Sequence, residues 1–167
     1  MRQMGRRMQG LGQLVISDEV RDAMARGWPV VALETAVLTH GLPFEVGVEI
    51  FGEMVSACWD NGAVPAPASI ISGAVRVGLS EDEIAALGPG SGAMKVGVRD
   101  IPFAVAEQAT GRMTVSATLR VCAIAGIEVM ATGGIGGVHA GGGLDVSSDL
   151  FELARTAALC VCSGPKS

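Results

Sequence analysis

Two lysines stand out among the residues that could do chemistry, because the other ten basic side chains are all arginines. Arginine stays protonated, whereas a lysine in an apolar site can lose its proton and attack a carbonyl carbon. Lys166 follows an apolar segment and the turn Ser163 to Pro165, at the carboxyl end of a predicted strand, where open α/β sheets place their ligands. The sequence therefore offers Lys166 as a nucleophile, with an ordinary solvated lysine as the alternative.

Glu34 comes directly after the apolar run Val30 to Leu33 and is a candidate proton donor. Desolvation at such a position raises the pKa of a carboxyl group, which suits proton donation near neutral pH. Burial of a carboxyl group with no task is costly, although a purely structural role stays open. His40 is ambiguous, and a hydrogen-bonding role in a loop is one of the possibilities.

Two further segments could contact an anion or a metal ion. The glycine-rich stretch Gly133 to His139 follows a predicted strand, and its free backbone N–H groups suit a phosphate group, with a tight structural turn as the alternative. It lacks the third glycine and the helix of a dinucleotide-binding fingerprint. Asp145 to Asp149 presents two carboxylates and two hydroxyls, which could be oxygen ligands of a hard divalent ion or ordinary helix caps.

The elements that would hold these residues alternate between strand and helix. We predict helices at residues 18–26, 44–59, 81–87, 100–110, 114–125 and 147–155, and strands at 29–33, 68–72, 74–78, 127–131 and 157–162. Ser17 and Ser80 are predicted N-caps, and Glu83 completes a capping box with Ser80. This alternation predicts an α/β fold, a three-layer α/β/α arrangement around a central, largely parallel or mixed sheet. Only five residues follow the last strand, so we expect the sheet to be incomplete.

Composition narrows the class of protein. The chain is 49% hydrophobic and 17% charged, which is typical of a folded domain. A net charge of −5 and 4% aromatic residues argue against a nucleic-acid partner. No apolar run approaches the ~20 residues of a membrane span. Residues 1–14 are predicted to be a flexible basic tail and residues 15–167 to belong to a single domain.

The four cysteines lack metal-binding spacing. Cys58, Cys122, Cys160 and Cys162 contain no CxxC pair, and no further ligands stand nearby in the sequence. We expect buried thiols in a reducing compartment, which predicts a cytoplasmic protein.

Seven blocks, in order along residues 29–167, resemble one family. They read VALET…THGLP (31–43), GAVPA (62–66), RVGL (76–79), KV…RD (95–100), ATGGIGGVH (131–139), DVSSDL (145–150) and CSGPKS (162–167). On these residues the chain resembles the N-terminal part of the pseudouridine-5′-phosphate glycosidases, also called indigoidine synthase A-like proteins. Arg112 and Met113 depart from the pattern, since family members usually carry small or hydroxyl residues there.

The resemblance implies an activity and a set of site residues. The activity is reversible cleavage of the C–C glycosidic bond of pseudouridine 5′-phosphate to uracil and ribose 5-phosphate, through a lysine iminium intermediate. Lys166 would be the nucleophile, Glu34 the proton donor, and Asp145 the ligand of a divalent cation, usually Mn²⁺. Substrate contacts would come from Lys95, Val115, Ser147, Ser148 and Asp149, with Thr132 and His139 lining the same pocket. The resemblance also implies a homotrimer.

Two other functions stay open on the sequence. The chain could be a truncated, non-catalytic remnant of such an enzyme, or a generic phosphate- or nucleotide-binding α/β module. Release of uracil would favour the enzyme, whereas saturable dinucleotide binding without uracil release would favour the module.

Overall fold

The computed structural model describes residues 13–39, 43–138 and 145–165. The strands in this part of the chain are β1 (Leu14–Ile16), β2 (Val30–Leu33), β3 (Val64–Ile71), β4 (Ala74–Val77), β5 (Met94–Val96), β6 (Gly111–Met113), β7 (Val129–Thr132) and β8 (Leu159–Cys162). The helices are α2 (Asp18–Arg26), α3 (Phe44–Asp60), α4 (Glu81–Ala85), α5 (Ile101–Ala106), α6 (Val115–Ala125) and α7 (Ser148–Leu153), with a 3-10 turn, η2, at Ala36–Leu38. The predicted alternation of strand and helix is confirmed.

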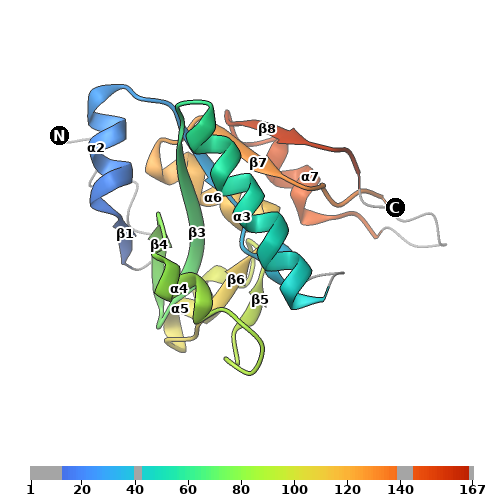
Figure 1. Cartoon of the computed structure of the whole chain (residues 1–167). Coiled ribbons are helices and arrows are strands. Elements are labelled where there is room, and N and C mark those ends of the chain that lie inside the picture. The colour runs from blue at the N-terminus through green and yellow to red at the C-terminus, as the bar shows by residue number, and fades with distance from the viewer. Residues whose placement is uncertain (1–12, 40–42, 139–144, 166–167) are drawn as a thin grey trace.

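The strands form one mixed sheet in the order β1-β4-β3-β2-β7-β8, and β6 joins it by pairing with β3 and β5 (Figure 1). β2, β7 and β8 run parallel to one another, whereas β3 is antiparallel to β4 and β6. Parallel strands bring their carboxyl ends to the same edge of a sheet, so the residues after β2, β7 and β8 share one edge.

Successive side chains of a strand point to opposite sides of the sheet, so both faces of this sheet carry apolar side chains. Helices cover both faces. Ala32 of β2 belongs to the apolar core that includes α2 and α6, whereas its neighbour Leu33 belongs to the core that includes Phe51 of α3. Figure 1 shows α3 crossing in front of the strands, with α6 behind them. The predicted three-layer α/β/α arrangement is thus confirmed.

β3 begins four residues earlier than predicted, at Val64, although Pro65 and Pro67 lie within it. The N–H group of Val64 donates to the Pro29 carbonyl at 2.8 Å, so alternate residues of β3 direct their polar groups toward β2. The carbonyl of Pro67 instead accepts from the N–H group of Gly78 at 2.8 Å, on the opposite side. Both prolines therefore face away from β2, and their missing N–H groups remove no hydrogen bond to β2.

The predicted caps are confirmed. Ser17 accepts a hydrogen bond from the N–H group of Val20 at 3.3 Å, and Ser80 and Glu83 form both hydrogen bonds of a capping box. The helix predicted at residues 100–110 ends at Ala106 instead, because Gln108 adopts a left-handed backbone with φ of 51°.

Three short strands, β1, β5 and β6, were not predicted from the sequence. Three residues carry too little alternation to reveal a strand. Because Leu14 begins β1 and lies opposite Val75 of β4, the predicted tail boundary at residue 14 is too late. Residues 1–12 of that tail lie outside the described part of the chain.

Thr35 ties the end of β2 to its neighbours. Its buried hydroxyl donates to the Ala68 carbonyl at 2.8 Å and accepts from the N–H group of Met113 at 3.0 Å. We expect Thr35→Val to lower the free energy of unfolding by about 2–4 kcal/mol, because it leaves two buried backbone groups without a partner. Urea denaturation measures this effect. The control is Thr156→Val, because the Thr156 hydroxyl makes no hydrogen bond to any described residue, and equal losses in the two variants would contradict the prediction.

Arg112 holds the loop between α4 and β5. Its guanidinium donates to the carbonyls of Leu87 at 2.7 Å and Ala93 at 2.9 Å, and the side chain is nearly buried. Arg112 stands where the family usually carries a small or hydroxyl residue. Its larger side chain has a structural explanation, since it bridges the two ends of the loop.

β8 is the last strand of the sheet, and within the described residues no strand pairs with its outer edge. Leu159 and Val161 are 63% and 54% exposed, on the face opposite Cys160. None of the helices in the described part of the chain combines the length and apolarity needed to cross a bilayer.

Candidate active site

Glu34 lies one residue beyond the end of β2. Its side chain is 2% exposed and accepts a hydrogen bond from the hydroxyl of Thr132, the last residue of β7. Leu33 lies opposite Ala131 in the parallel register, so the next pair along the strands brings Glu34 and Thr132 together. The structure thus unites two of the predicted site residues at the carboxyl edge of the sheet.

The segment that leads to Lys166 lies beside the glycine-rich loop. Cys162 of β8 is opposite Thr132, and further along the N–H group of Ile135 donates to the Gly164 carbonyl at 3.0 Å. Ile135 also pairs with Pro165, the residue bonded to Lys166 in the chain. Lys166, His139 and His40 themselves lie outside the described residues, so their roles stay predictions.

Asp149 joins the glycine-rich loop to helix α6. It is 8% exposed, and its two carboxylate oxygens accept from the N–H groups of Ser116 at 2.8 Å and Gly136 at 2.9 Å. Ser116 belongs to the first turn of α6, where free N–H groups attract negative charge. Asp149 therefore places its own carboxylate at this helix terminus and positions the loop, while its predicted contact with substrate stays a prediction.

Ser147 is the N-cap of α7, as the capping alternative predicted. Its hydroxyl accepts from the N–H group of Asp149 at 3.2 Å, and its own N–H group donates to the Gly137 carbonyl at 3.0 Å. Gly136 packs so closely that a Cβ atom there would lie 2.2 Å from the Ser147 Oγ. The glycine-rich loop and the start of α7 therefore form one tightly packed unit.

Asp145 and Ser148 line a polar hollow of about 450 Å³ together with Asp100. Asp100 is fixed there because its carboxylate accepts from the N–H group of Gly97 at 2.8 Å. Sequence reasoning gave Asp100 no role, although the glycine three residues earlier was a signal of this turn. No cluster of three or more His, Cys, Asp or Glu suited to one metal ion occurs among the described residues.

Lys95 and Val115 differ in what they can present to a substrate. Lys95 lies on β5 with an exposed side chain, whereas the Val115 side chain is 1% exposed and belongs to the core. Val115 is the first residue of α6, so its N–H group has no partner within the helix. Any contact of Val115 with a ligand would therefore use its backbone.

The thiols of Cys122, in the core, and Cys160, partly buried against it, are hard to ionise. Burial raises the pKa of Cys122 to about 12 and that of Cys160 to about 11. The charges of Cys162, Asp149 and Glu34 add to the effect on Cys160, which indicates that Cys160 lies near both carboxylates. All four cysteines are free thiols, but Cys122 alone is buried as predicted, whereas Cys58, Cys160 and Cys162 are partly exposed.

These pKa values predict a loss of stability in alkaline solution. The folded chain holds both protons more tightly than the unfolded chain, where the thiol pKa is 9.0. The resulting stabilisation is complete below pH 9 and is lost as the pH rises toward the folded values. With no tyrosine and two lysines, the chain has few other groups that titrate there. We expect the urea concentration at the unfolding midpoint to fall as the pH rises from 9 to 11. The fall should be less steep in Cys122→Ala. Equal slopes of the midpoint against pH in the wild type and the variant would refute the explanation.

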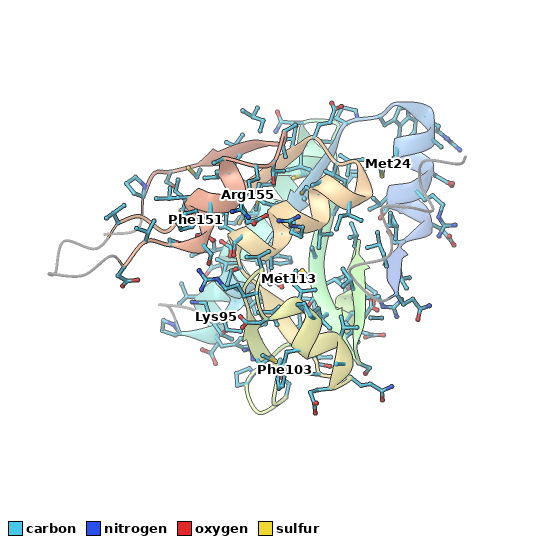
Figure 2. All side chains as sticks on the ribbon, turned by 180° about the vertical axis from the view of Figure 1, so that it is seen from behind. Met24, Lys95, Phe103, Met113, Phe151 and Arg155 are labelled. Atoms are coloured by element: carbon cyan, nitrogen blue, oxygen red, sulfur yellow. The ribbon has the colours of Figure 1, made fainter. Side chains whose placement is uncertain are left out.

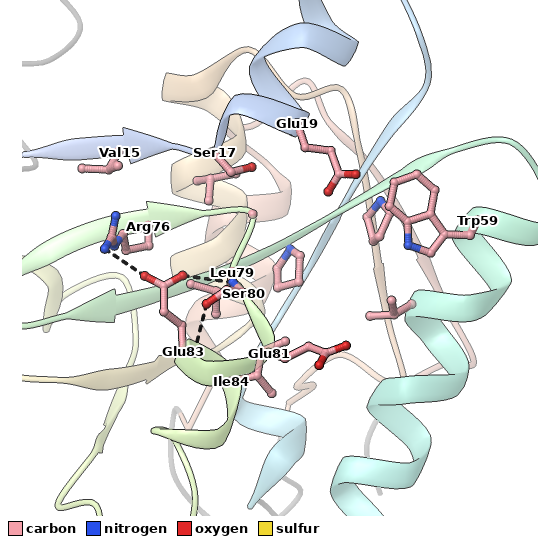
Figure 3. Close-up of a pocket in the computed structure, with 15 residues that line it drawn as sticks. Val15, Ser17, Glu19, Trp59, Arg76, Leu79, Ser80, Glu81, Glu83 and Ile84 are labelled. Atoms are coloured by element: carbon pink, nitrogen blue, oxygen red, sulfur yellow. Dashed lines mark hydrogen bonds and ion pairs between the residues drawn. The ribbon is translucent and has the colours of Figure 1, made fainter.

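A second hollow, of about 480 Å³, lies between α2, α4 and the end of α3 (Figure 3). Its walls include Trp59, Pro65 and the ion pair between Arg76 and Glu83, whose atoms are 2.9 Å apart. None of the predicted catalytic, substrate-binding or metal-binding residues lines it. Although this hollow is large, we therefore do not assign the reaction to it.

Comparison with known proteins identifies the family to which this chain belongs. The chain matches the family model described as "Indigoidine synthase A like protein" over residues 19–167. Proteins named pseudouridine-5′-phosphate glycosidase from Escherichia coli (strain K12) and Glaesserella parasuis serovar 5 are 48% and 45% identical to it. Each alignment covers 92% of this chain but 50% and 52% of the relative. The chain thus spans about half the length of the curated relatives it matches.

Two solved structures share the fold. An indigoidine synthase A-like protein from Thermotoga maritima is 39% identical with a TM-score of 0.82, and the match covers 94% of this chain and 51% of that one. The prealnumycin C-glycosynthase AlnA, solved in complex with ribulose 5-phosphate, is 37% identical with a TM-score of 0.82, covering 93% of this chain and 51% of that one. The chain belongs to the indigoidine synthase A-like family, whose members include proteins named pseudouridine-5′-phosphate glycosidase.

Proposed function

We propose that this chain takes part in the cleavage of pseudouridine 5′-phosphate to uracil and ribose 5-phosphate, at the edge of the sheet where β2, β7 and β8 end. The observation that carries the proposal is the buried Glu34, which accepts a hydrogen bond from Thr132. Both residues lie beside the segment that leads to Lys166. The names of the relatives support the substrate. A homotrimer is the assembly proposed with this function.

A lysine suits this reaction because the substrate is a C-glycoside. In the familiar pair of glycosidase carboxyl groups, one member protonates the oxygen of the leaving group. A bond between two carbons has no such oxygen. The electrons of that bond must instead pass to uracil, while the sugar carbon needs a substituent that can supply electrons. A neutral amine on C1′ supplies them from its nitrogen lone pair.

The proposed steps balance as follows. The Lys166 amine bonds to C1′ as the C1′–O4′ bond breaks and O4′ gains a proton, which opens the ribose ring. The C1′–C5 bond then breaks, its electrons pass to uracil, C5 takes a proton, and the nitrogen lone pair forms the iminium. Water adds to the iminium carbon and expels the amine, which releases ribose 5-phosphate. The net reaction consumes one water molecule.

Glu34 is the group proposed to hold and move protons during these steps. A carboxyl group that is 2% exposed is shielded from bulk water, and the Thr132 hydroxyl orients it. The hydrogen bonds that the Asp149 carboxylate accepts from the N–H groups of Ser116 and Gly136 position the loop that borders the same edge. These contacts keep the proton-transfer group and the loop in one arrangement.

A divalent ion fits the polar hollow beside this edge. Carboxylate and hydroxyl oxygens line it, and these are the ligands that Mn²⁺ and Mg²⁺ accept. Asp145 would hold the ion, with water in most other positions because few carboxylates lie nearby. When bound, such an ion would orient the pyrimidine and its waters.

The direct test is incubation of the protein with pseudouridine 5′-phosphate and Mn²⁺, followed by chromatography for free uracil. Borohydride reduces an iminium to a stable amine, so a parallel reaction should leave the sugar phosphate on the peptide that contains Lys166. Absence of both uracil and the adduct would refute the proposal for this chain. Saturable dinucleotide binding under the same conditions would then favour a binding module.

A further inference from the structure

Three arginines converge on a small pocket between α6 and α7. Arg120 comes from α6, Arg155 follows α7, and Arg99 lies on the segment between β5 and α5. The pocket has a volume of about 330 Å³, and Phe151 stands on its rim with 47% of its surface exposed. Figure 2 shows Phe151 and Arg155 close together where α7 lies beside α6.

The pocket is positive in a chain that is otherwise acidic. Glu152 is the acidic residue among those that line it, so its three arginines leave a charge of about +2, whereas the whole chain carries −5. Seven arginines lie in the described residues, and three of them line this one pocket. Such a concentration raises the local potential for an anion.

Glu152 holds Arg120 in place and lies near Arg155. Its carboxylate is 2% exposed and lies 2.9 Å from the Arg120 guanidinium and 3.9 Å from that of Arg155. Arg99, by contrast, makes no hydrogen bond or ion pair to any described residue. The Arg99 guanidinium is therefore available to a ligand, in a pocket whose Arg120 is already oriented by Glu152.

We infer that this pocket binds a phosphate monoester. Guanidinium groups bind phosphate oxygens through paired, charge-assisted hydrogen bonds, and several together favour a doubly charged group. The hydroxyl of Ser148 also lines the pocket and can donate to the phosphate, while Phe151 can pack against the esterified part. Glu34 and Thr132 do not line this pocket. It is therefore separate from the sheet edge at which we propose that the glycosidic bond is cleaved.

The phosphate could belong to the proposed substrate or to a separate ligand, and the chemistry of recognition is the same. Ser148 and Arg99 line both this pocket and the polar hollow of Asp145, so the two are adjacent. Competition distinguishes the sources. Inorganic phosphate that competes with pseudouridine 5′-phosphate for binding indicates the substrate's own phosphate, whereas simultaneous binding indicates a second ligand.

The test measures binding rather than turnover, so its result does not depend on the proposed reaction. Calorimetric titration of the full chain with inorganic phosphate and with ribose 5-phosphate at low ionic strength should saturate. We expect Arg99→Gln and Arg155→Gln each to weaken binding about tenfold, which corresponds to loss of one charge-assisted hydrogen bond. Arg21→Gln removes the same charge from the exposed surface of α2 and should leave binding unchanged.

Two results would overturn the inference. One is a wild-type chain that shows no saturable binding of either phosphate compound. The other is an equal loss of affinity in Arg21→Gln, which would indicate a general charge effect. Circular dichroism of each variant verifies the fold, and Arg120 is left intact because it pairs with the buried Glu152.

Discussion

Replacing Lys166 by alanine is expected to lower the rate of uracil release by about 10⁴-fold or more, the scale seen when a covalent nucleophile is removed. The proposed reaction needs a nitrogen lone pair on C1′, and Lys166 is the residue proposed to supply it. Glu34 and Thr132 would still be present, but neither can form an iminium. The measurement is the initial rate of uracil formation at saturating substrate.

The matched variant is Lys166→Arg, which keeps the positive charge. Because an arginine stays protonated, it should be as inactive as the alanine variant, and borohydride should trap nothing on either. Substantial activity in Lys166→Arg would show that position 166 acts only through its charge. Lys95→Ala serves as a comparison, since loss of a substrate contact should raise KM more than it lowers kcat.

Replacing Gly136 by alanine is expected to lower the free energy of unfolding by about 1–3 kcal/mol, the usual effect of overpacking. The new Cβ would lie 2.2 Å from the Ser147 Oγ and 2.6 Å from its Cβ. Ser147 cannot move away easily, because it caps α7 and bonds to Gly137. The loop must shift instead, which stretches the hydrogen bond from Gly136 to Asp149.

Gly133→Ala is the control, because it lies in the same loop but a Cβ there meets nothing within 4 Å. Neither glycine requires a left-handed backbone, so the two variants differ in packing alone. Urea denaturation should separate them, and uracil release should fall in Gly136→Ala only. Equal stability of the two variants would contradict the close packing of the loop on α7.

The elements with strong local signals were predictable. The helices at 18–26, 44–60 and 115–125 carry caps, periodicity or long apolar runs, and the structure has them within one residue of the prediction. The first half of β3 was missed because its two prolines argue against a central strand, and only the pairing partner shows that they face away from β2. The strands β5 and β6 depend on contacts distant in sequence.

The candidate site was predictable where it follows from strand ends. Glu34 and Thr132 each end an apolar run, and parallel pairing of these runs makes them neighbours. The two backbone contacts of Asp149 were not predictable, because they join a loop and a helix that only the fold brings together. The convergence of Arg99, Arg120 and Arg155 is likewise a product of helix packing.

The outer edge of β8, with which no strand in the described part of the chain pairs, has a consequence for handling the protein. A terminal strand with exposed Leu159 and Val161 is a template on which another chain can form backbone hydrogen bonds. Concentrated solutions should therefore self-associate, with light scattering that grows over time. Val161→Lys would place charge on that strand and should delay the onset of aggregation.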